Sequence, residues 1–144
     1  PLSINYAAEN VPAIINAWEP GQFGGQAIAE ILYGKVNPSA KLAMTMPRSA
    51  GQISTWYNHK ASAFFHPVVC GKSTPLYPFG YGLSYTKFEE NWLDDDTAEV
   101  KNVGDMDSWH TVLKFEKEPH PQLVGFSKVW IPAGETVRVK VKKD

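Results

Sequence analysis

Carboxylates are the first side chains in this sequence that could perform chemistry. Hydrolysis by a carboxylate pair needs two such groups on ordered walls of one cleft, roughly 5–9.5 Å apart. Only Glu19 stands beside both an aromatic residue and a Pro-Gly turn, and one carboxylate is half of that mechanism. Glu30 falls between the apolar positions of an expected helix, where we expect it to be solvated. The other carboxylates of interest are Glu89, Glu90 and the acidic run at residues 94–96. We interpret the acidic run as a solvated link between two halves of the chain.

A glycine-rich stretch, Pro-Gly-Gln-Phe-Gly-Gly at residues 20–25, precedes that expected helix. Glycines in this position let backbone N–H groups approach an anion. The stretch has neither the G-x-x-x-x-G-K-[ST] nor the G-x-G-x-x-G spacing of phosphate loops. Close packing of the helix, or approach of the loop to a ligand, is therefore the better interpretation.

Metal and nucleophile motifs are not found in the sequence. Zinc sites on helices place two histidines four residues apart, and no pair here has that spacing. A single cysteine gives neither an internal disulfide nor a Cys-based metal site. We therefore expect no metal and no cofactor; the residues considered are His59, His66, His110, His120 and Cys70.

Aromatic residues give the one positive indication of ligand binding. The chain has five Trp, six Tyr and seven Phe, many of them in a Pro- and Gly-rich segment at residues 48–88. Trp and Tyr present flat apolar faces with polar edges, which suit stacking on the C–H face of a sugar. The same residues suit a core or a domain interface, and composition alone favours the core.

The elements that would position these residues divide the chain in two. Residues 2–6, 13–18 and 41–46 read as short strands, and residues 26–33 as a helix stopped by Gly34. Strands around a helix indicate part of an α/β layer. After residue 93, residues 111–115 and 136–141 alternate as strands do, with turns at 102–105 and 132–135. These are too few strands for a complete sandwich of about seven.

Bulk properties exclude some classes of partner. The 144 residues carry a net charge of −1 and are 43% hydrophobic, so the chain can bury a core. There is no basic stripe for nucleic acid, no apolar run of membrane-spanning length and no signal peptide at the start. We expect neither nucleic acid nor a membrane as a partner.

Two long motifs resemble family 3 glycoside hydrolases, which include β-glucosidases. Residues 17–34 read AWEPGQFGGQAIAEILYG and are followed by NPS at residues 37–39 and KL at 41–42. This is similar to the family pattern W-x-P-G-x-x-G-G-x-A-x-A-x-x-L-x-G-x-x-N-P-S-G-[KR]-L-P of the C-terminal α/β sandwich domain. Residues 75–88, PLYPFGYGLSYTKF, resemble the passage to a fibronectin type III-like domain, and residues 100–105, 125–129 and 132–136 resemble that domain. Ala40 and Ala43 depart from the pattern, which has Gly and Pro there.

The resemblance implies a fold class of α/β plus β. Residues 1–92 would be the C-terminal part of the α/β sandwich domain with an aromatic interdomain loop, and residues 93–144 part of the fibronectin type III-like domain. The parent would be a retaining exo-glycosidase for β-glucosides or short β-glucans, although related members take xylosides or N-acetylglucosaminides. It would be periplasmic or secreted and need no cofactor.

The family's catalytic Asp and Glu fall outside the matched motifs, so the resemblance implies no catalytic residue in this chain. The substrate-cleft candidates are Trp18, Glu19, Gly24 and Gly25, at a predicted strand end. The partners would be a glucoside or oligosaccharide and the remaining domains of the parent enzyme. The stretches at 88–102 and 119–123 are shorter than the family's, which suggests a partial copy of a longer chain. A non-catalytic carbohydrate-binding or interaction module, and a structural fragment without a ligand, stay open as alternatives.

Overall fold

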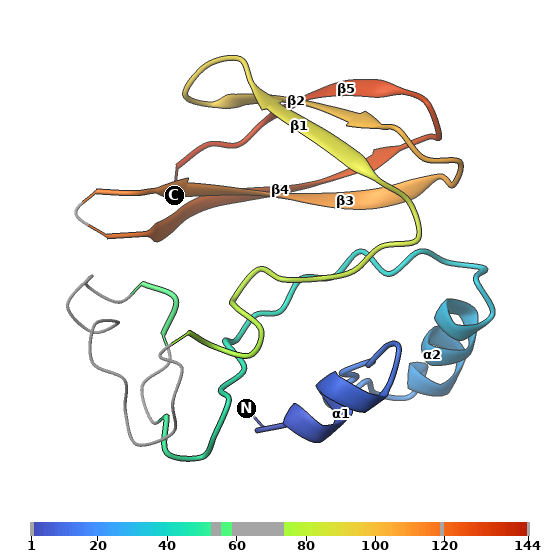
Figure 1. Ribbon diagram of the computed structural model, residues 1–144. Helices are drawn as coiled ribbons and strands as arrows, with labels where there is room; N and C mark the ends of the chain where they lie inside the picture. The colour runs from blue at the N-terminus through green and yellow to red at the C-terminus, as the bar shows by residue number, and fades with distance from the viewer. Residues whose placement is uncertain (1, 53–55, 59–73, 119, 144) are drawn as a thin grey trace. The chain divides into compact units, whose positions relative to one another are not determined.

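The computed structural model describes residues 2–52, 56–58, 74–118 and 120–143. His59, His66 and Cys70 lie outside these residues. Helices α1 and α2 precede strands β1 to β5 along the chain (Figure 1). Contacts divide the chain into two compact units. The first comprises Pro1–Asn16, Lys41–Tyr81 and Phe115–Gln122, and the second comprises Ala17–Ala40, Gly82–Lys114 and Leu123–Asp144.

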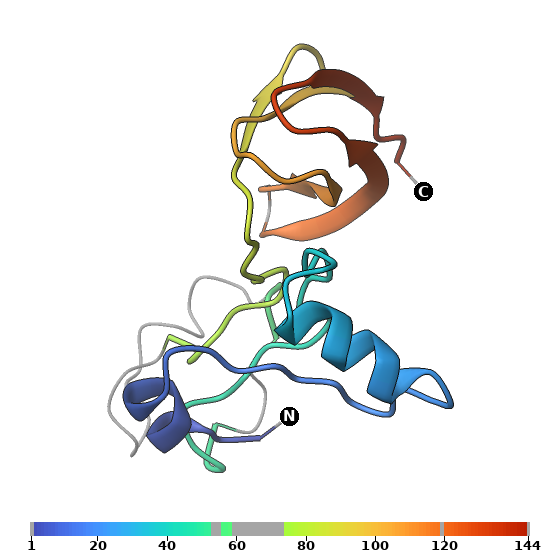
Figure 2. The same ribbon diagram turned by 90° about the vertical axis from the view of Figure 1, so that its right-hand side faces the viewer.

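The second unit is built on two small sheets. Strands β1 (Phe88–Trp92), β2 (Thr97–Asn102) and β5 (Thr136–Lys140) form an antiparallel sheet in the order β1-β2-β5. Strands β3 (Ser108–Glu116) and β4 (Gln122–Ile131) form the other sheet. Apolar side chains from both sheets make one buried core, which consists of Ala98, Val100, Val112, Ile131, Val139 and Val141. Figure 2 shows the strands wrapped around this shared interior, and we refer to β1–β5 as the sandwich.

Alternation in the sequence explains β5. Val139 and Val141 are buried, Val137 is partly buried, and Arg138 and Lys140 between them are exposed. Successive side chains of a strand point to opposite faces, so an alternating Val run gives one apolar face to the core. The predicted strands at residues 111–115 and 136–141 are confirmed.

A buried amide closes one end of the sandwich. Asn102 is fully buried, and its Nδ2 donates to the carbonyls of Met106 (2.9 Å) and Ile131 (3.0 Å). Its Oδ1 accepts hydrogen bonds from the Thr86 hydroxyl (2.7 Å) and the Gly104 N–H (3.2 Å). A Cβ at position 104 would overlap the Thr86 hydroxyl, so the turn that follows Asn102 requires glycine there. One side chain thus joins three segments of the sandwich.

The acidic run lies in the turn between β1 and β2, so its interpretation as a link between two halves was wrong. Asp94 Oδ1 accepts the N–H groups of Asp96 (2.8 Å) and Thr97 (2.7 Å), and these bonds hold the pKa of Asp94 below its usual value. Lys114 Nζ lies 2.8 Å from Asp96 Oδ1 and 3.5 Å from Asp95 Oδ2. The hydrogen bond to Asp96 raises the pKa of Lys114. The run is exposed, yet it fixes a turn and pairs with a nearly buried lysine.

The helical predictions were right for one element and wrong for another. Helix α2 (Gly24–Leu32) covers the predicted helix, and Gly34 follows it with φ +70°, the left-handed value that suits a helix stop. Residues 2–6 were predicted as a strand, but α1 (Asn5–Asn10) begins within them. Its Ala-Ala-Glu centre favours a helix.

Two further predicted strands, at residues 13–18 and 41–46, were also wrong. No strand of the described residues pairs with residues 13–18, whose Ile14 and Ile15 are exposed. Residues 41–46 run beside residues 76–81, but only one bridge forms, between Met46 and Tyr77. The Leu42 N–H donates to the Tyr81 carbonyl (2.8 Å) and the Gly80 N–H donates to the Leu42 carbonyl (2.8 Å), so the two segments are joined at both ends without a regular ladder. The described fold is therefore mostly strand, in two sheets, with few helices.

Candidate functional site

The turn before α2 carries the candidate cleft residues and contains an unusual backbone conformation. Trp18 has φ +47°, and it is the single non-glycine residue with positive φ in the part of the chain that the structure describes. A bulky residue there pays a steric cost, because its Cβ approaches the backbone too closely. Its side chain is 56% exposed even so. Strain at an exposed aromatic residue is typical of functional positions.

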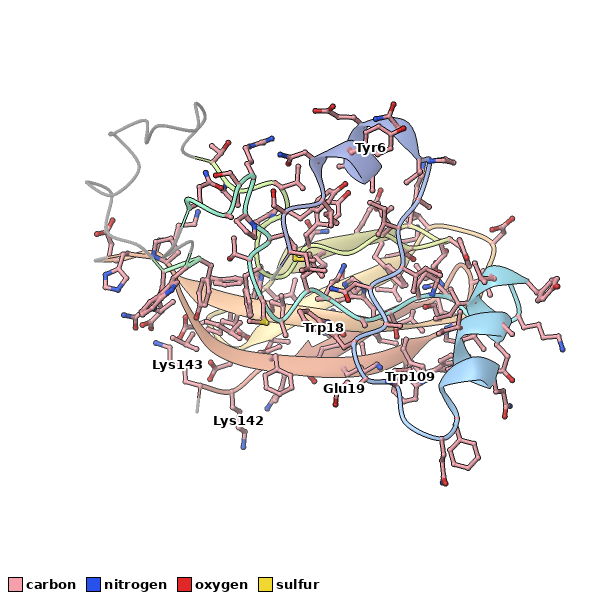
Figure 3. All side chains as sticks on the ribbon, turned by 90° about the horizontal axis from the view of Figure 1, so that it is seen from below. Tyr6, Trp18, Glu19, Trp109, Lys142 and Lys143 are labelled. Carbon is pink, nitrogen blue, oxygen red and sulfur yellow. The ribbon has the colours of Figure 1, made fainter. Side chains whose placement is uncertain are left out.

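Glu19 follows Trp18 on the same segment, as Figure 3 shows, and it too is exposed. The chain then turns at Gly21, with φ +69°, and the Gly24 N–H donates to the Gly21 carbonyl (3.1 Å). Trp18 and Glu19 are thus presented by one short turn that leads into α2.

The two glycines Gly24 and Gly25 differ in their surroundings. Gly24 is buried, and a Cβ there would overlap the Pro20 ring, with Pro20 Cβ only 2.6 Å away. Gly25 is exposed, and a Cβ there would meet nothing within 4 Å. Gly24 therefore serves close packing of the turn on the helix, one of the two interpretations that the sequence favoured. Gly25 has no such constraint.

Asn37 holds the chain after α2, and its role was missed from the sequence. Its side chain is buried and its Nδ2 donates to the hydroxyls of Ser84 (3.0 Å) and Ser108. Its Oδ1 accepts the Tyr85 N–H (2.6 Å). The Tyr85 hydroxyl donates to the carbonyl of Ile31 in α2 (2.8 Å). The motifs at residues 37–39 and 75–88 thus meet in one hydrogen-bond network, a contact that their separation in sequence hides.

The remaining polar candidates do not join this turn. Glu30 accepts a hydrogen bond from Gln26 within α2 (2.8 Å). His110 is buried in β3, where it bonds to Glu90 of β1 and packs against the tilted ring of Phe88, with ring centroids 4.1 Å apart. Within the described ranges, no three His, Cys, Asp or Glu side chains come together as a metal site. No helix in those ranges has the length and hydropathy to cross a bilayer.

Among the described residues, aromatic side chains meet in both units. In the first unit, Tyr57 stacks on Phe79 (4.4 Å between centroids), and Phe115 packs edge-on against both rings. In the second unit, Trp109 and Trp130 meet edge to face at 5.6 Å, with Lys128 Nζ 5.7 Å from the Trp109 ring. These two Trp side chains are 46% and 45% exposed. Tyr57 and Phe79 of the first unit are partly buried, while the two Trp side chains present ring surface.

Comparison with known protein families shows to which family this chain belongs. The family described as Glycosyl hydrolase family 3 C-terminal domain matches residues 1–85, more than half of the chain. The chain belongs to glycosyl hydrolase family 3.

Relatives with glycosidase names are similar to almost all of this chain. A putative β-xylosidase of Formosa agariphila is 34% identical, and the match covers 98% of this chain and 21% of that protein. A periplasmic β-glucosidase of Salmonella typhimurium is also 34% identical, over 100% of this chain and 23% of its own length. The second alignment extends over 173 positions, more than the 144 residues here, so this chain lacks segments that the relative has.

Solved structures of β-glucosidases agree with the fold. A β-glucosidase from Erythrobacter marinus superposes with a TM-score of 0.87 at 39% identity, over 96% of this chain and 21% of that one. A β-glucosidase from Listeria innocua, solved in complex with glucose, gives 0.84 at 30% identity, over 96% and 23%. The chain therefore spans about a fifth of the length of the relatives that it matches.

Proposed function

We propose that this chain is the C-terminal part of a family 3 glycosidase that hydrolyses β-glucosides or short β-glucans. It would contribute scaffold and one wall of the substrate cleft. The observation that carries the proposal is the strained, exposed Trp18 followed by Glu19 inside the family motif. The catalytic Asp and Glu would lie elsewhere in the enzyme, which supplies the carboxylate pair. The named relatives include β-glucosidases and β-xylosidases, so both sugars belong in the test.

The division into domains is part of the same proposal. Residues 1–92 would complete an α/β sandwich domain, and residues 93–144 would belong to a fibronectin type III-like domain. Exposed Val11, Ile14 and Ile15 support the first part, because an exposed apolar patch of this kind is expected to be covered by another part of such a domain. Pairing of β1 with β2 favours counting Phe88–Trp92 with the second part. A periplasmic or secreted location is proposed by likeness to the Salmonella enzyme.

Hydrolysis of nitrophenyl glycosides tests the assignment of activity. The whole protein should release nitrophenol from β-glucoside or β-xyloside, and the 144-residue chain alone should release none. Turnover by the isolated chain would show that a carboxylate pair is present here after all. Lack of turnover by the whole protein on either sugar would refute the glycosidase proposal.

Replacement of Trp18 tests the cleft wall. Trp18→Gly and Trp18→Ala both remove the ring, and we expect each to lower kcat/KM of the whole protein about tenfold, the loss of a sugar-stacking contact. Glycine adopts positive φ freely, so Trp18→Gly should be about 1 kcal/mol more stable than Trp18→Ala. Activities are compared by initial rates and stabilities by urea unfolding. If both variants kept the wild-type kcat/KM, Trp18 would make no substrate contact in the cleft.

One observation favours a second candidate, a non-catalytic carbohydrate-binding module. The exposed Trp109–Trp130 pair offers ring surface beside Lys128. Calorimetric titration of the 144-residue chain with cello-oligosaccharides tests it. Binding that Trp109→Ala abolishes, together with an inactive whole protein, would favour the module over the glycosidase.

A further inference from the structure

The turn that carries Trp18 and Glu19 belongs to the same compact unit as the sandwich. Ala17–Ala40 clusters with Gly82–Lys114 and Leu123–Asp144, and it is separated from Lys41–Tyr81, which directly follows it in sequence. The turn therefore clusters with the strands and not with the residues that directly follow it in sequence.

The first links join the turn to α2. Pro20 packs so closely on Gly24 that position 24 has no room for a Cβ. The Ala27 N–H donates to the carbonyl of Phe23, four residues earlier in the chain, as the helix begins (3.0 Å). A nine-residue helix is a stiff rod of about 14 Å. The position of its C-terminal end therefore sets the position of the turn at its start.

The next links join the end of α2 to the sandwich. The Tyr85 hydroxyl bonds to the Ile31 carbonyl (2.8 Å), and Asn37 bonds to Ser84, to the Tyr85 N–H and to Ser108, the first residue of β3. The Thr111 hydroxyl of β3 adds a longer bond to the Ser39 carbonyl (3.3 Å). Asn37 and Ser108 are 6% and 1% exposed, so water cannot readily replace their hydrogen bonds.

We propose that the sandwich is the element that positions the Trp18–Glu19 turn, and that Asn37 is the positioning residue through which it does so. The inference rests on the proposed function only for its effect on catalysis. Small displacements of substrate-contacting groups reduce rates strongly, because reacting groups must be held within fractions of an ångström. A contact far from the cleft in sequence would therefore govern substrate binding.

The test compares two variants that both weaken the sandwich. Asn37→Ala removes the amide that holds the segment after α2. Val139→Ala opens the core at β5, and no residue of 17–40 belongs to that core. Amide hydrogen exchange is followed in the 144-residue chain. KM and kcat on a nitrophenyl β-glucoside are measured in the whole protein, with kcat calculated from the concentration of folded enzyme.

Asn37→Ala should speed exchange of the α2 amides about tenfold relative to Val139→Ala, and kcat/KM should fall roughly five- to tenfold, mostly through KM. Val139→Ala should stay within about twofold of wild type in kcat/KM. Ser108→Ala removes one of the hydrogen bonds of Asn37, together with the local bond from the Ser108 hydroxyl to the Trp109 carbonyl (2.7 Å). It should show the same change at smaller size, and it carries the test if Asn37→Ala does not fold. Equal α2 exchange in Asn37→Ala and Val139→Ala, or an unchanged KM in Asn37→Ala, would overturn the proposal. If the wild type hydrolyses nothing, only the proposed function fails, since exchange still decides the anchoring.

Discussion

Asn102→Ala is expected to lower the free energy of unfolding by about 3–4 kcal/mol, because each buried polar group that loses its partner costs about 1–3 kcal/mol. The substitution leaves the Thr86 hydroxyl, which is 4% exposed, and the Gly104 N–H without their acceptor. The carbonyls of Met106 and Ile131 also lose their donor. Urea unfolding followed by circular dichroism measures the change.

Asn91→Ala is the matched control for this substitution. Asn91 lies on β1 with an exposed side chain, and the same amide is removed there without emptying a buried network. Its free energy of unfolding should stay within about 0.5 kcal/mol of wild type, as is usual at exposed positions. Similar losses in Asn91→Ala and Asn102→Ala would show that the buried network contributes little.

Gly24→Ala and Gly25→Ala should change stability in opposite directions. Alanine is the better helix former by about 1 kcal/mol, so Gly25→Ala, with open space at its Cβ, should raise the free energy of unfolding by about 0.5–1 kcal/mol. At position 24 the new methyl group meets the Pro20 ring, and overpacking of this kind costs about 1–3 kcal/mol. We expect a net loss of about 2 kcal/mol for Gly24→Ala.

Chemical unfolding of both variants measures these changes, and exchange of the α2 amides reports whether the loss is local to the turn. A stabilised Gly24→Ala variant would mean that Pro20 moves aside at little cost. In that case the link between the turn and α2 would be loose.

Local pattern was enough to predict the elements whose identity depends on neighbours in sequence. The alternation of Val137, Val139 and Val141 gave β5, and apolar spacing with a following Gly34 gave α2. Residues 13–18 have strand-like composition as well, but a strand exists only through a paired partner, and no described segment pairs with them. Composition therefore could not distinguish them from β5.

The turn that carries the cleft candidates could be picked out from the sequence, but its backbone conformation and the contacts that support it could not. The motif indicated Trp18, yet the positive φ of Trp18 contradicts the usual preference of a bulky residue, so no local rule foretells it. Asn37 reaches Ser108, 71 residues away in sequence, and Asn102 reaches Ile131, 29 residues away. Such contacts depend on the tertiary fold. Ala40, where the family pattern has Gly, does not have positive φ, so alanine causes no backbone strain there.

The placement of residues 17–40 with the sandwich has a consequence for recombination between family 3 enzymes. A crossover at residue 93, where the sequence motifs change character, would take Ser84 and Tyr85 from one parent enzyme and Ser108 from the other. The hydrogen-bond partners of Asn37 would then come from two different enzymes. Chimaeras that exchange residues 17–40 together with residues 82–114 and 123–144 would inherit matched partners. The unit that must be exchanged as a whole is thus encoded by three separate stretches of the gene, so a single crossover cannot transfer it intact.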